Sequence, residues 1–280
     1  MTLDAGGVTG YLVARGVVPS DSELTVEVLG GGVSGTVLAV HGPGIALVVK
    51  QALPKLLVDD AWFAPARRTD TEAAALRLAA RLLPGRVPPV IDSDDRQHVL
   101  VMQHAPAGWR NWQAEMLAGR VHAETGTWAG DTLGRLHAAT AGDAEVAEAF
   151  GDYAPKNILL GSDGTWLLDA EVAHVGHPVF DLAFFLAFAL LTAVERPELA
   201  ASCSLLTERF TTAYARRAGE LAPSAPAVAK HTGAMLLART DGRSPAAFLS
   251  PAARERARAL GRRLLLEPAP ALSEVVASCG

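Results

Sequence analysis

Residues 151–171 read GDYAPKNILLGSDGTWLLDAE, and this stretch decides how the rest of the chain is interpreted. Two short apolar runs, Ile158–Leu160 and Trp166–Leu168, flank a glycine-containing turn and predict a hairpin. Asp152 stands shortly before this hairpin and Asp169 follows it directly. Because a hairpin returns the chain toward its starting point, we expect the two carboxylates to face each other.

The spacing of the polar residues is typical of a phosphoryl-transfer site. Asn157 follows Asp152 by five residues, the arrangement in which the aspartate accepts a hydroxyl proton and the asparagine supports a metal ion. Asp169 ends a strand, and carboxylate oxygens suit a hard cation such as Mg²⁺. The alternative is a pair of acidic turns on a solvated hairpin, which is how we interpret Asp163. We predict that Asp152, Asn157 and Asp169 converge on a magnesium-bound triphosphate, with Asp152 as the catalytic residue.

A glycine cluster between two predicted strands offers a place for phosphates. Backbone N–H groups can approach phosphate oxygens closely where no Cβ intervenes. The cluster is not a Walker A loop, because no Gly-Lys-Ser/Thr follows, and not a Rossmann turn, because a strand follows it. A flexible hairpin turn is the alternative. The candidate phosphate-binding residues are Gly30, Gly31, Gly32, Ser34 and Gly35.

Lys50 ends an apolar strand and therefore needs an anionic partner. A pair of phosphates is one candidate, and Glu72 on the next predicted helix is another. Thr69 and Glu72 also have the spacing of a capping box at the start of that helix. A surface lysine with its charge in water is the alternative for Lys50. Together with the glycine hairpin, Lys50 and Glu72 are the phosphate-binding parts of a protein-kinase-type fold.

The pattern of elements predicts an α+β, bilobal, protein-kinase-like fold. Residues 1–103 form the nucleotide-binding lobe, a five-stranded antiparallel sheet with one long helix and a short leading one, and residues 104–280 form a mainly helical lobe for catalysis and acceptor binding. The expected strands are 24–29, 36–41, 45–50, 87–91 and 98–103, the first three as a meander and the fourth at an edge because of Pro88 and Pro89. The expected helices are 9–17, 69–83, 128–140, 182–194, 204–218 and 252–265, with Pro223–Pro226 in a loop.

Composition restricts the compartment and the partners. The net charge is −5 over 280 residues, with no Lys/Arg-rich run, which argues against a nucleic-acid partner. The longest apolar run, Leu182–Val194, is too short to span a bilayer, so no membrane association is expected. Cys203 and Cys279 form no metal-binding motif, and the first residues lack the pattern of a signal peptide. We expect a cytoplasmic monomer or homodimer.

The motifs at residues 29–183, in this order, resemble those of the aminoglycoside phosphotransferase and choline kinase superfamily, and the KQALPK stretch and the Asp169-Ala-Glu171 pair resemble its methylthioribose-kinase-like branch. The resemblance implies an ATP-dependent enzyme with Asp152 as the catalytic residue. It implies that Asn157, Asp169 and Glu171 bind Mg²⁺, and that Lys50 with Glu72 holds the ATP phosphates. The adenine is expected at backbone groups of Gln103 and Ala105.

The resemblance and the local charge also bear on which acceptor molecule is phosphorylated. Phe150 replaces the histidine usual before Gly-Asp, and about ten residues separate Thr140 from Gly151 where relatives have several dozen. Between residues 142 and 182 there are eight acids and one base, a surplus that favours a cationic acceptor. The hypothesis is an antibiotic kinase for an aminoglycoside or a basic peptide such as capreomycin. A sugar or metabolite kinase of methylthioribose type and a non-catalytic, nucleotide-binding pseudokinase are the alternatives.

Overall fold

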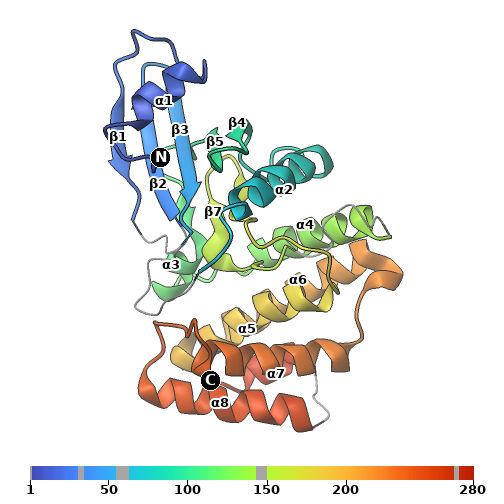
Figure 1. Cartoon of the computed structure of the whole chain (residues 1–280). Helices are drawn as coiled ribbons and strands as arrows, with labels where there is room; N and C mark the ends of the chain where they lie inside the picture. Colours follow the sequence, from blue (N-terminus) through green and yellow to red (C-terminus); the bar gives the residue numbers. More distant parts are fainter. Residues whose placement is uncertain (1, 31–34, 55–62, 143–149, 268–270) are drawn as a thin grey trace. The chain divides into compact units, whose positions relative to one another are not determined.

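The chain forms two compact units in the computed structural model, which describes residues 2–30, 35–54, 63–142, 150–267 and 271–280 (Figure 1). The first unit combines Met1–Trp109 with Gly161–Ala173, and the second combines Arg110–Leu160 with His174–Gly280. The expected division into lobes after residue 103 stays a prediction.

The first unit is built on the predicted five-stranded antiparallel sheet, with the strand order β1-β2-β3-β5-β4. Its strands are β1 (Thr25–Val28), β2 (Gly35–Gly42), β3 (Ile45–Ala52), β4 (Val90–Asp94) and β5 (Val99–Gln103). The first three strands form the expected meander, and β4 lies at an edge. Proline before β4 is tolerated there because an edge strand needs fewer ladder hydrogen bonds.

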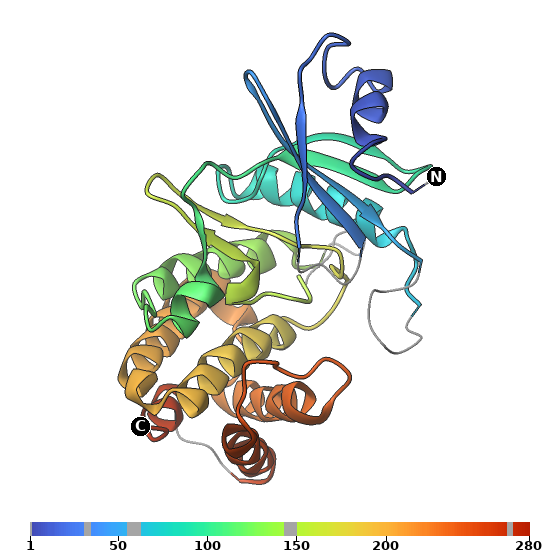
Figure 2. The same cartoon turned by 90° about the vertical axis from the view of Figure 1, so that its left-hand side faces the viewer.

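The alternation of side chains along β3 separates the roles of the two sheet faces. Leu47 and Val49 join Leu12 of α1 (Val8–Ala14) in a buried apolar cluster. Lys50 has the opposite parity, and its ammonium group contacts Glu72 of α2 (Arg68–Leu82). The helices α1 and α2 therefore lie on opposite faces of the sheet (Figure 2). The Glu72 carboxylate of α2 reaches Lys50 on its face.

The predicted capping box at the start of α2 is wrong. Arg67 is the N-cap residue, no side chain caps the helix, and Thr69 lies inside its first turn. Glu72 does not reach back to the helix terminus, because its carboxylate is bound to Lys50 at 2.7 Å. The ion pair outcompetes the local cap because a buried charge requires an opposite charge.

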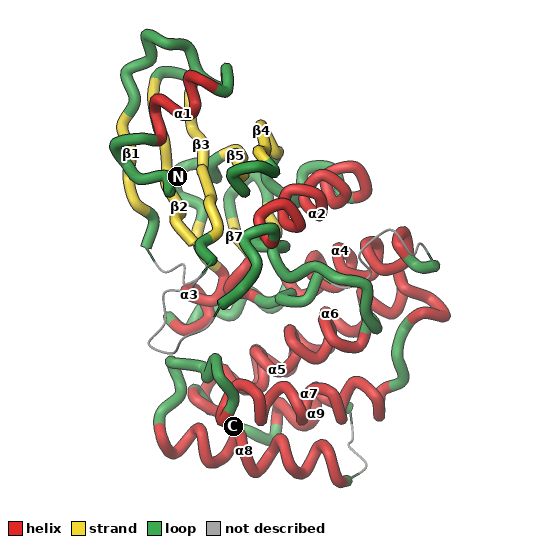
Figure 3. Tube along the Cα trace, in the orientation of Figure 1, coloured by secondary structure: helices red, strands yellow, loops and turns green. Residues whose placement is uncertain are grey.

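The second unit is mainly helical, as predicted (Figure 3). Its helices are α3 (Trp112–Leu117), α4 (Thr125–Thr140), α5 (Val179–Glu195), α6 (Ala200–Ala218), α7 (Ala225–Asp241), α8 (Pro251–Leu266) and α9 (Leu272–Ala277). A short antiparallel pair, β6 (Arg110–Asn111) with β7 (Ile158–Leu160), adjoins them, while β8 (Thr165–Leu167) belongs to the first unit. No helix in the described part of the chain is both long and apolar enough to cross a lipid bilayer.

Helices α4 and α6 cross at unusually close range because α4 presents glycines every four residues. A Cβ on Gly130 would lie 2.1 Å from the carbonyl oxygen of Phe210, and one on Gly126 would lie 2.7 Å from that of Leu206. Gly134 continues the stripe against Tyr214. Small residues at this spacing allow two helix backbones to touch, which fixes α4 against α6.

The sequence prediction missed α3, α7 and α9. Pro226 was expected in a loop but lies in the first turn of α7. Proline is accepted there because the first N–H groups of a helix have no partner within the helix. The predicted strands of the hairpin at 158–168 are confirmed as β7 and β8.

Candidate active site

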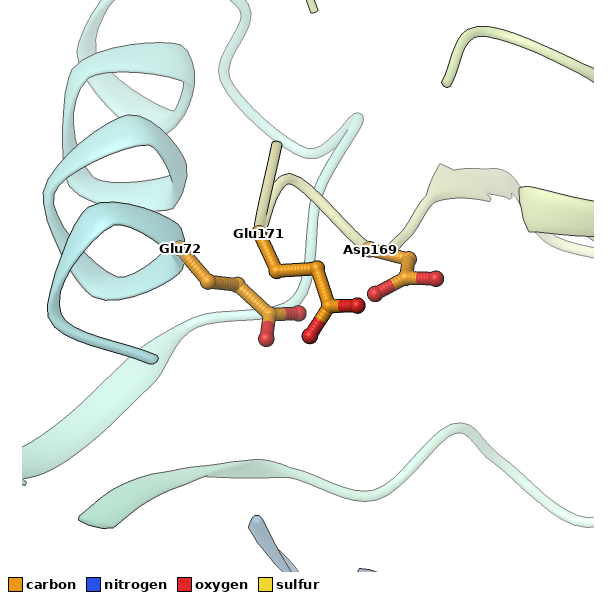
Figure 4. Close-up of side chains that lie close together, drawn as sticks. All are labelled: Glu72, Asp169 and Glu171. Atoms are coloured by element: carbon orange, nitrogen blue, oxygen red, sulfur yellow. The ribbon is translucent and has the colours of Figure 1, made fainter. Parts of the chain in front are cut away.

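Three carboxylates gather in the first unit, beside the end of β3. Glu72 comes from α2, and Asp169 and Glu171 follow β8. One oxygen of each lies within 4.8 Å of the others, and Figure 4 shows their carboxylates grouped together. The Lys50 ammonium donates to Glu72 at 2.7 Å and to Asp169 at 3.2 Å, so the predicted Lys50–Glu72 pair is confirmed and extends to Asp169.

The ionisation of this cluster reflects its burial. Burial raises the pKa of Glu72 to about 7; the charge of Lys50 opposes this shift, and Asp169 and Glu171 add to it. Burial alone would lower the pKa of Lys50, but the negative charges of Glu72 and Asp169 outweigh it and raise that pKa. Lys50 therefore remains a cation at neutral pH, fixed between two acids.

The backbone at Asp169 is in the left-handed region, with φ at 62°. This conformation is uncommon for a residue with a side chain, and such residues cluster at functional sites. Two residues further on, the Glu171 carboxylate forms an ion pair with Arg68, with Nε to Oε2 at 3.4 Å. Arg68, from the first turn of α2, is a residue that the sequence analysis did not single out.

The remaining nucleotide-binding candidates are only partly described. Gly31, Gly32 and Ser34 lie outside the described residues, and Gly30 follows β1. Gly35 begins β2, where a Cβ would lie 2.3 Å from the carbonyl oxygen of Gln51, so a side chain is excluded.

The two expected adenine contacts lie where the first unit's sheet ends. Gln103 is the last residue of β5, and its N–H donates to the carbonyl of Pro89 at 2.9 Å. The carbonyl of Ala105 pairs with the His104 ring nitrogen Nδ1 at 2.7 Å. Their contacts with adenine stay predictions.

The second unit holds Asp152 on a loop that ends in a single 3₁₀ turn, Pro155–Asn157. Asn157 Nδ2 donates to the Asp152 carbonyl at 2.9 Å and to its carboxylate at 3.1 Å, so the five-residue spacing does bring the two side chains together. Lys156 forms an ion pair with the same carboxylate. Asn111, at the start of α3, donates to the Lys156 carbonyl at 2.6 Å and ties the turn to the helix. The convergence of Asp152 and Asn157 with Asp169 stays a prediction.

Asp181 anchors the start of this loop. An aspartate at the start of an apolar helix is commonly its N-cap, but the N-cap residue of α5 is Pro178 and Asp181 lies within the first turn. Its carboxylate accepts the backbone N–H of Phe150 at 2.6 Å and that of Gly151 at 2.7 Å. Gly151 has a φ of 82°, which a side chain would strain.

A buried hydrogen-bond network holds the Asp181 side chain in place. The His137 ring contacts Asp181 at 3.2 Å through Nε2 and the Tyr214 hydroxyl at 3.0 Å through Nδ1. Burial, with the charge of Asp181, raises the pKa of Tyr214, which keeps the phenol neutral. Phe150, which directly precedes Gly151 and Asp152, is 2% exposed, so an aromatic packs at this position. The helices α4, α5 and α6 thus meet at the loop's anchor.

Three residues that position the loop or the cluster escaped sequence reasoning: Asn111, His137 and Arg68. His137 lies on the buried face of α4 with Leu133 and Leu136. A polar residue on an apolar helix face needs a buried partner, and this was the signal that could have identified it. Asn111 and Arg68 act on residues far away in the sequence, so no local spacing indicates their partners.

Comparison with known proteins identifies the fold. Neither models of protein families nor curated protein sequences match this sequence. Among solved structures, a choline/ethanolamine kinase family protein from Mesorhizobium loti is 16% identical, with a TM-score of 0.52 over 98% of this chain and 99% of that one. Choline kinase from Cryptosporidium parvum Iowa II is 10% identical, with a TM-score of 0.61 over 94% of each chain.

An aminoglycoside phosphotransferase, APH(2'')-Ib in its ADP-bound form, is 12% identical, with a TM-score of 0.52 over 95% of this chain and all 100% of that one. The chain therefore has the fold shared by choline kinases and aminoglycoside phosphotransferases, as the sequence motifs predicted. The finer resemblances, to capreomycin phosphotransferase and to methylthioribose kinase, stay predictions.

Proposed function

We propose that this protein is an ATP-dependent phosphotransferase that acts on a hydroxyl group of a small molecule. The observation that carries the proposal is the Lys50 ammonium held at 2.7 Å from Glu72 and 3.2 Å from Asp169. A strand lysine bound to a helix glutamate is the arrangement by which kinases hold ATP phosphates. The fold, shared with an ADP-bound aminoglycoside phosphotransferase, supports the same conclusion.

The residues of the acidic cluster fit a magnesium ion. Their donors are carboxylate oxygens, which a hard cation prefers, and Asp169 and Glu171 are partly exposed. Glu72 is fully buried and bound to Lys50, so Asp169 and Glu171 are the proposed ligands, with Asn157 as the third. Bound there, the ion would neutralise charge on the phosphates during transfer.

Asp152 has the proposed catalytic role. The acceptor hydroxyl oxygen forms a bond to the γ-phosphorus of ATP, the bond between that phosphorus and the leaving ADP oxygen breaks, and the hydroxyl proton passes to the Asp152 carboxylate. Asn157 and Lys156 hold that carboxylate in one orientation. Lys50 and the glycine segment from Gly30 to Gly35 bind the phosphates, and backbone groups of Gln103 and Ala105 bind adenine.

A cationic antibiotic is the proposed acceptor. The stretch between residues 142 and 182 contains eight acids and one base, a surplus that favours a cationic acceptor. Aminoglycosides and basic peptides such as capreomycin have this charge and carry hydroxyl groups. Transfer of a phosphoryl group to such a compound would confer resistance on the cell that makes the enzyme.

The test is transfer of label from γ-³²P-ATP to a panel of aminoglycosides and basic peptides, with and without Mg²⁺. We expect a labelled product that requires Mg²⁺ and is lost in Asp152→Asn. Asp163→Asn is the matched control, because this aspartate is exposed and an asparagine can still accept from Trp109. No labelled antibiotic from any member of the panel would reject this acceptor class. Equal rates in the wild type and Asp152→Asn would support the pseudokinase alternative.

One observation favours a second candidate, a sugar or metabolite kinase. Burial lowers the pKa of Arg239, at the end of α7, and the charge of Asp152 opposes that shift, so the two charges interact. Arg239 Nη1 also donates to the Ser244 carbonyl at 2.5 Å, which fixes the guanidinium. An arginine near the catalytic carboxylate suits an acceptor with anionic or hydroxyl-rich groups. Labelling of methylthioribose or another sugar, and of no antibiotic, would decide for this candidate.

A further inference from the structure

The guanidinium of Arg68 is held in a single orientation by the backbone around it. Nη1 donates to the carbonyls of Ala64 and Pro65, each at 3.1 Å, and Nη2 donates to that of Leu53 at 2.8 Å. The side chain is 9% exposed. A buried arginine with its fork fixed by three carbonyls has little freedom to reorient, because the donors are arranged in one rigid plane.

The Nε atom of this guanidinium faces Glu171, at 3.4 Å from Oε2. Three carboxylates within 4.8 Å repel one another, and Lys50 compensates two of them, Glu72 and Asp169. Arg68 supplies the positive charge beside the third. Glu171 is therefore held beside Asp169 by a cation that is itself anchored.

We propose that Arg68 is a positioning residue for the metal site, which holds Glu171 so that both acids of the Asp169-Ala-Glu171 pair bind one Mg²⁺ ion. The inference rests on the proposed function, because it concerns the ion that the phosphotransferase would use. Arg68 itself does not contact the ion. Its role follows from the anchored guanidinium and from the ion pair with Glu171.

Metal binding can be measured without turnover. Mn²⁺ is a suitable probe because it takes the same oxygen ligands as Mg²⁺. Free Mn²⁺ is followed by its electron paramagnetic resonance signal during titration of the whole protein with a non-hydrolysable ATP analogue. Arg68→Lys keeps the charge but loses the planar fork, and we expect it to weaken Mn²⁺ binding by roughly 10- to 100-fold, the usual effect of removing a residue that orients a ligand.

A double-mutant cycle separates positioning from a general effect on folding. In Glu171→Gln, Arg68 has lost its charged partner. The double variant Arg68→Lys/Glu171→Gln is therefore expected to bind Mn²⁺ with the same affinity as Glu171→Gln alone. Glu171→Asp tests the same contact from the other side, because the shorter acid keeps its charge but withdraws from the anchored guanidinium. Glu171→Asp should weaken Mn²⁺ binding as much as Arg68→Lys does, and it keeps the test available if Arg68→Lys folds poorly.

Arg67→Lys is the matched control, since this neighbouring arginine is exposed and successive helix residues point in different directions. It should bind Mn²⁺ like the wild type. If Arg68→Lys and Glu171→Asp also bind like the wild type, or if the effects of Arg68→Lys and Glu171→Gln simply add, the inference is overturned while the proposed function stands. A wild-type protein that binds no Mn²⁺ with the nucleotide would overturn both.

Discussion

Replacing Asp181 by asparagine tests the anchor of the catalytic loop with almost no change in shape. The aspartate is completely buried, and its two oxygens accept the N–H groups of Phe150 at 2.6 Å and of Gly151 at 2.7 Å. An asparagine has one oxygen and one NH₂ group. Whichever way the amide is turned, one of the two backbone N–H groups then faces a donor instead of an acceptor.

The magnitude follows from these two hydrogen bonds. A buried donor left without an acceptor costs about 1–3 kcal/mol, and a bond to a neutral oxygen is weaker than one to a charged oxygen by about 1 kcal/mol. We therefore expect Asp181→Asn to lower the free energy of opening this loop by about 2–4 kcal/mol. At about 1.4 kcal/mol for each factor of ten, amide exchange at Phe150 and Gly151 should accelerate roughly 30- to 700-fold.

Hydrogen exchange followed by nuclear magnetic resonance reports these two amides individually. Asp21→Asn provides the matched control, because this aspartate is exposed and the same chemical change should leave the exchange rates as they are. The reasoning fails if Phe150 and Gly151 stay as protected in Asp181→Asn as in the wild type. It also fails if every amide in the second unit accelerates equally, since that would be global destabilisation without a local anchor.

Two further changes test packing and charge. Gly130→Ala should lower the free energy of unfolding by about 1–3 kcal/mol, because the added Cβ would lie 2.1 Å from the Phe210 carbonyl oxygen. Gly10→Ala, in α1 with open space around it, should instead raise the free energy of unfolding by about 0.5–1 kcal/mol. Urea unfolding of both variants and the wild type measures these differences. Hydrogen bonds from Arg120 and then His122 lower the pKa of Glu115 to about 2 from 4.5, so its stabilising effect is present above pH 4.5 and is lost as pH falls toward 2. The Glu115→Gln variant should lose less thermal stability than the wild type between these pH values, and parallel curves would contradict the assignment.

Local spacing predicted contacts within one element or one hairpin. It failed where a side chain instead binds a charged group or backbone that is distant in the sequence. The Asp152–Asn157 pair was predictable because a loop of five residues returns the chain on itself. The need of Lys50 for an anionic partner was equally predictable, since the lysine ends a run of buried apolar residues. Glu72 has perfect capping spacing, yet its carboxylate binds Lys50 because an ion pair satisfies a buried acid better than one backbone N–H.

Asp181 shows the same limit in another form. Its position at the start of an apolar helix predicts a cap, because caps are the commonest use of aspartate there. The carboxylate instead serves the backbone of residues 150 and 151, about thirty positions earlier. Only the packing of α4 and α6, set by glycines and by the His137–Tyr214 contact, determines that this backbone passes beside α5. No pattern within residues 179–195 contains that information.

The burial of the acids separates those that build the site from those proposed to meet a ligand. Glu72 and Asp181 have side chains 1% and 0% exposed, and each is bound by donors from its own unit. Asp152, Glu171 and Asp169 are 17%, 19% and 32% exposed, each with a cation at its edge. A carboxylate that must take up a proton or a metal ion needs access to solvent, while one that fixes a loop or a lysine is more effective when water cannot compete. The gradient of exposure therefore supports a positioning role for Glu72 and Asp181, and it supports the proposal that the other three acids take part in the chemistry.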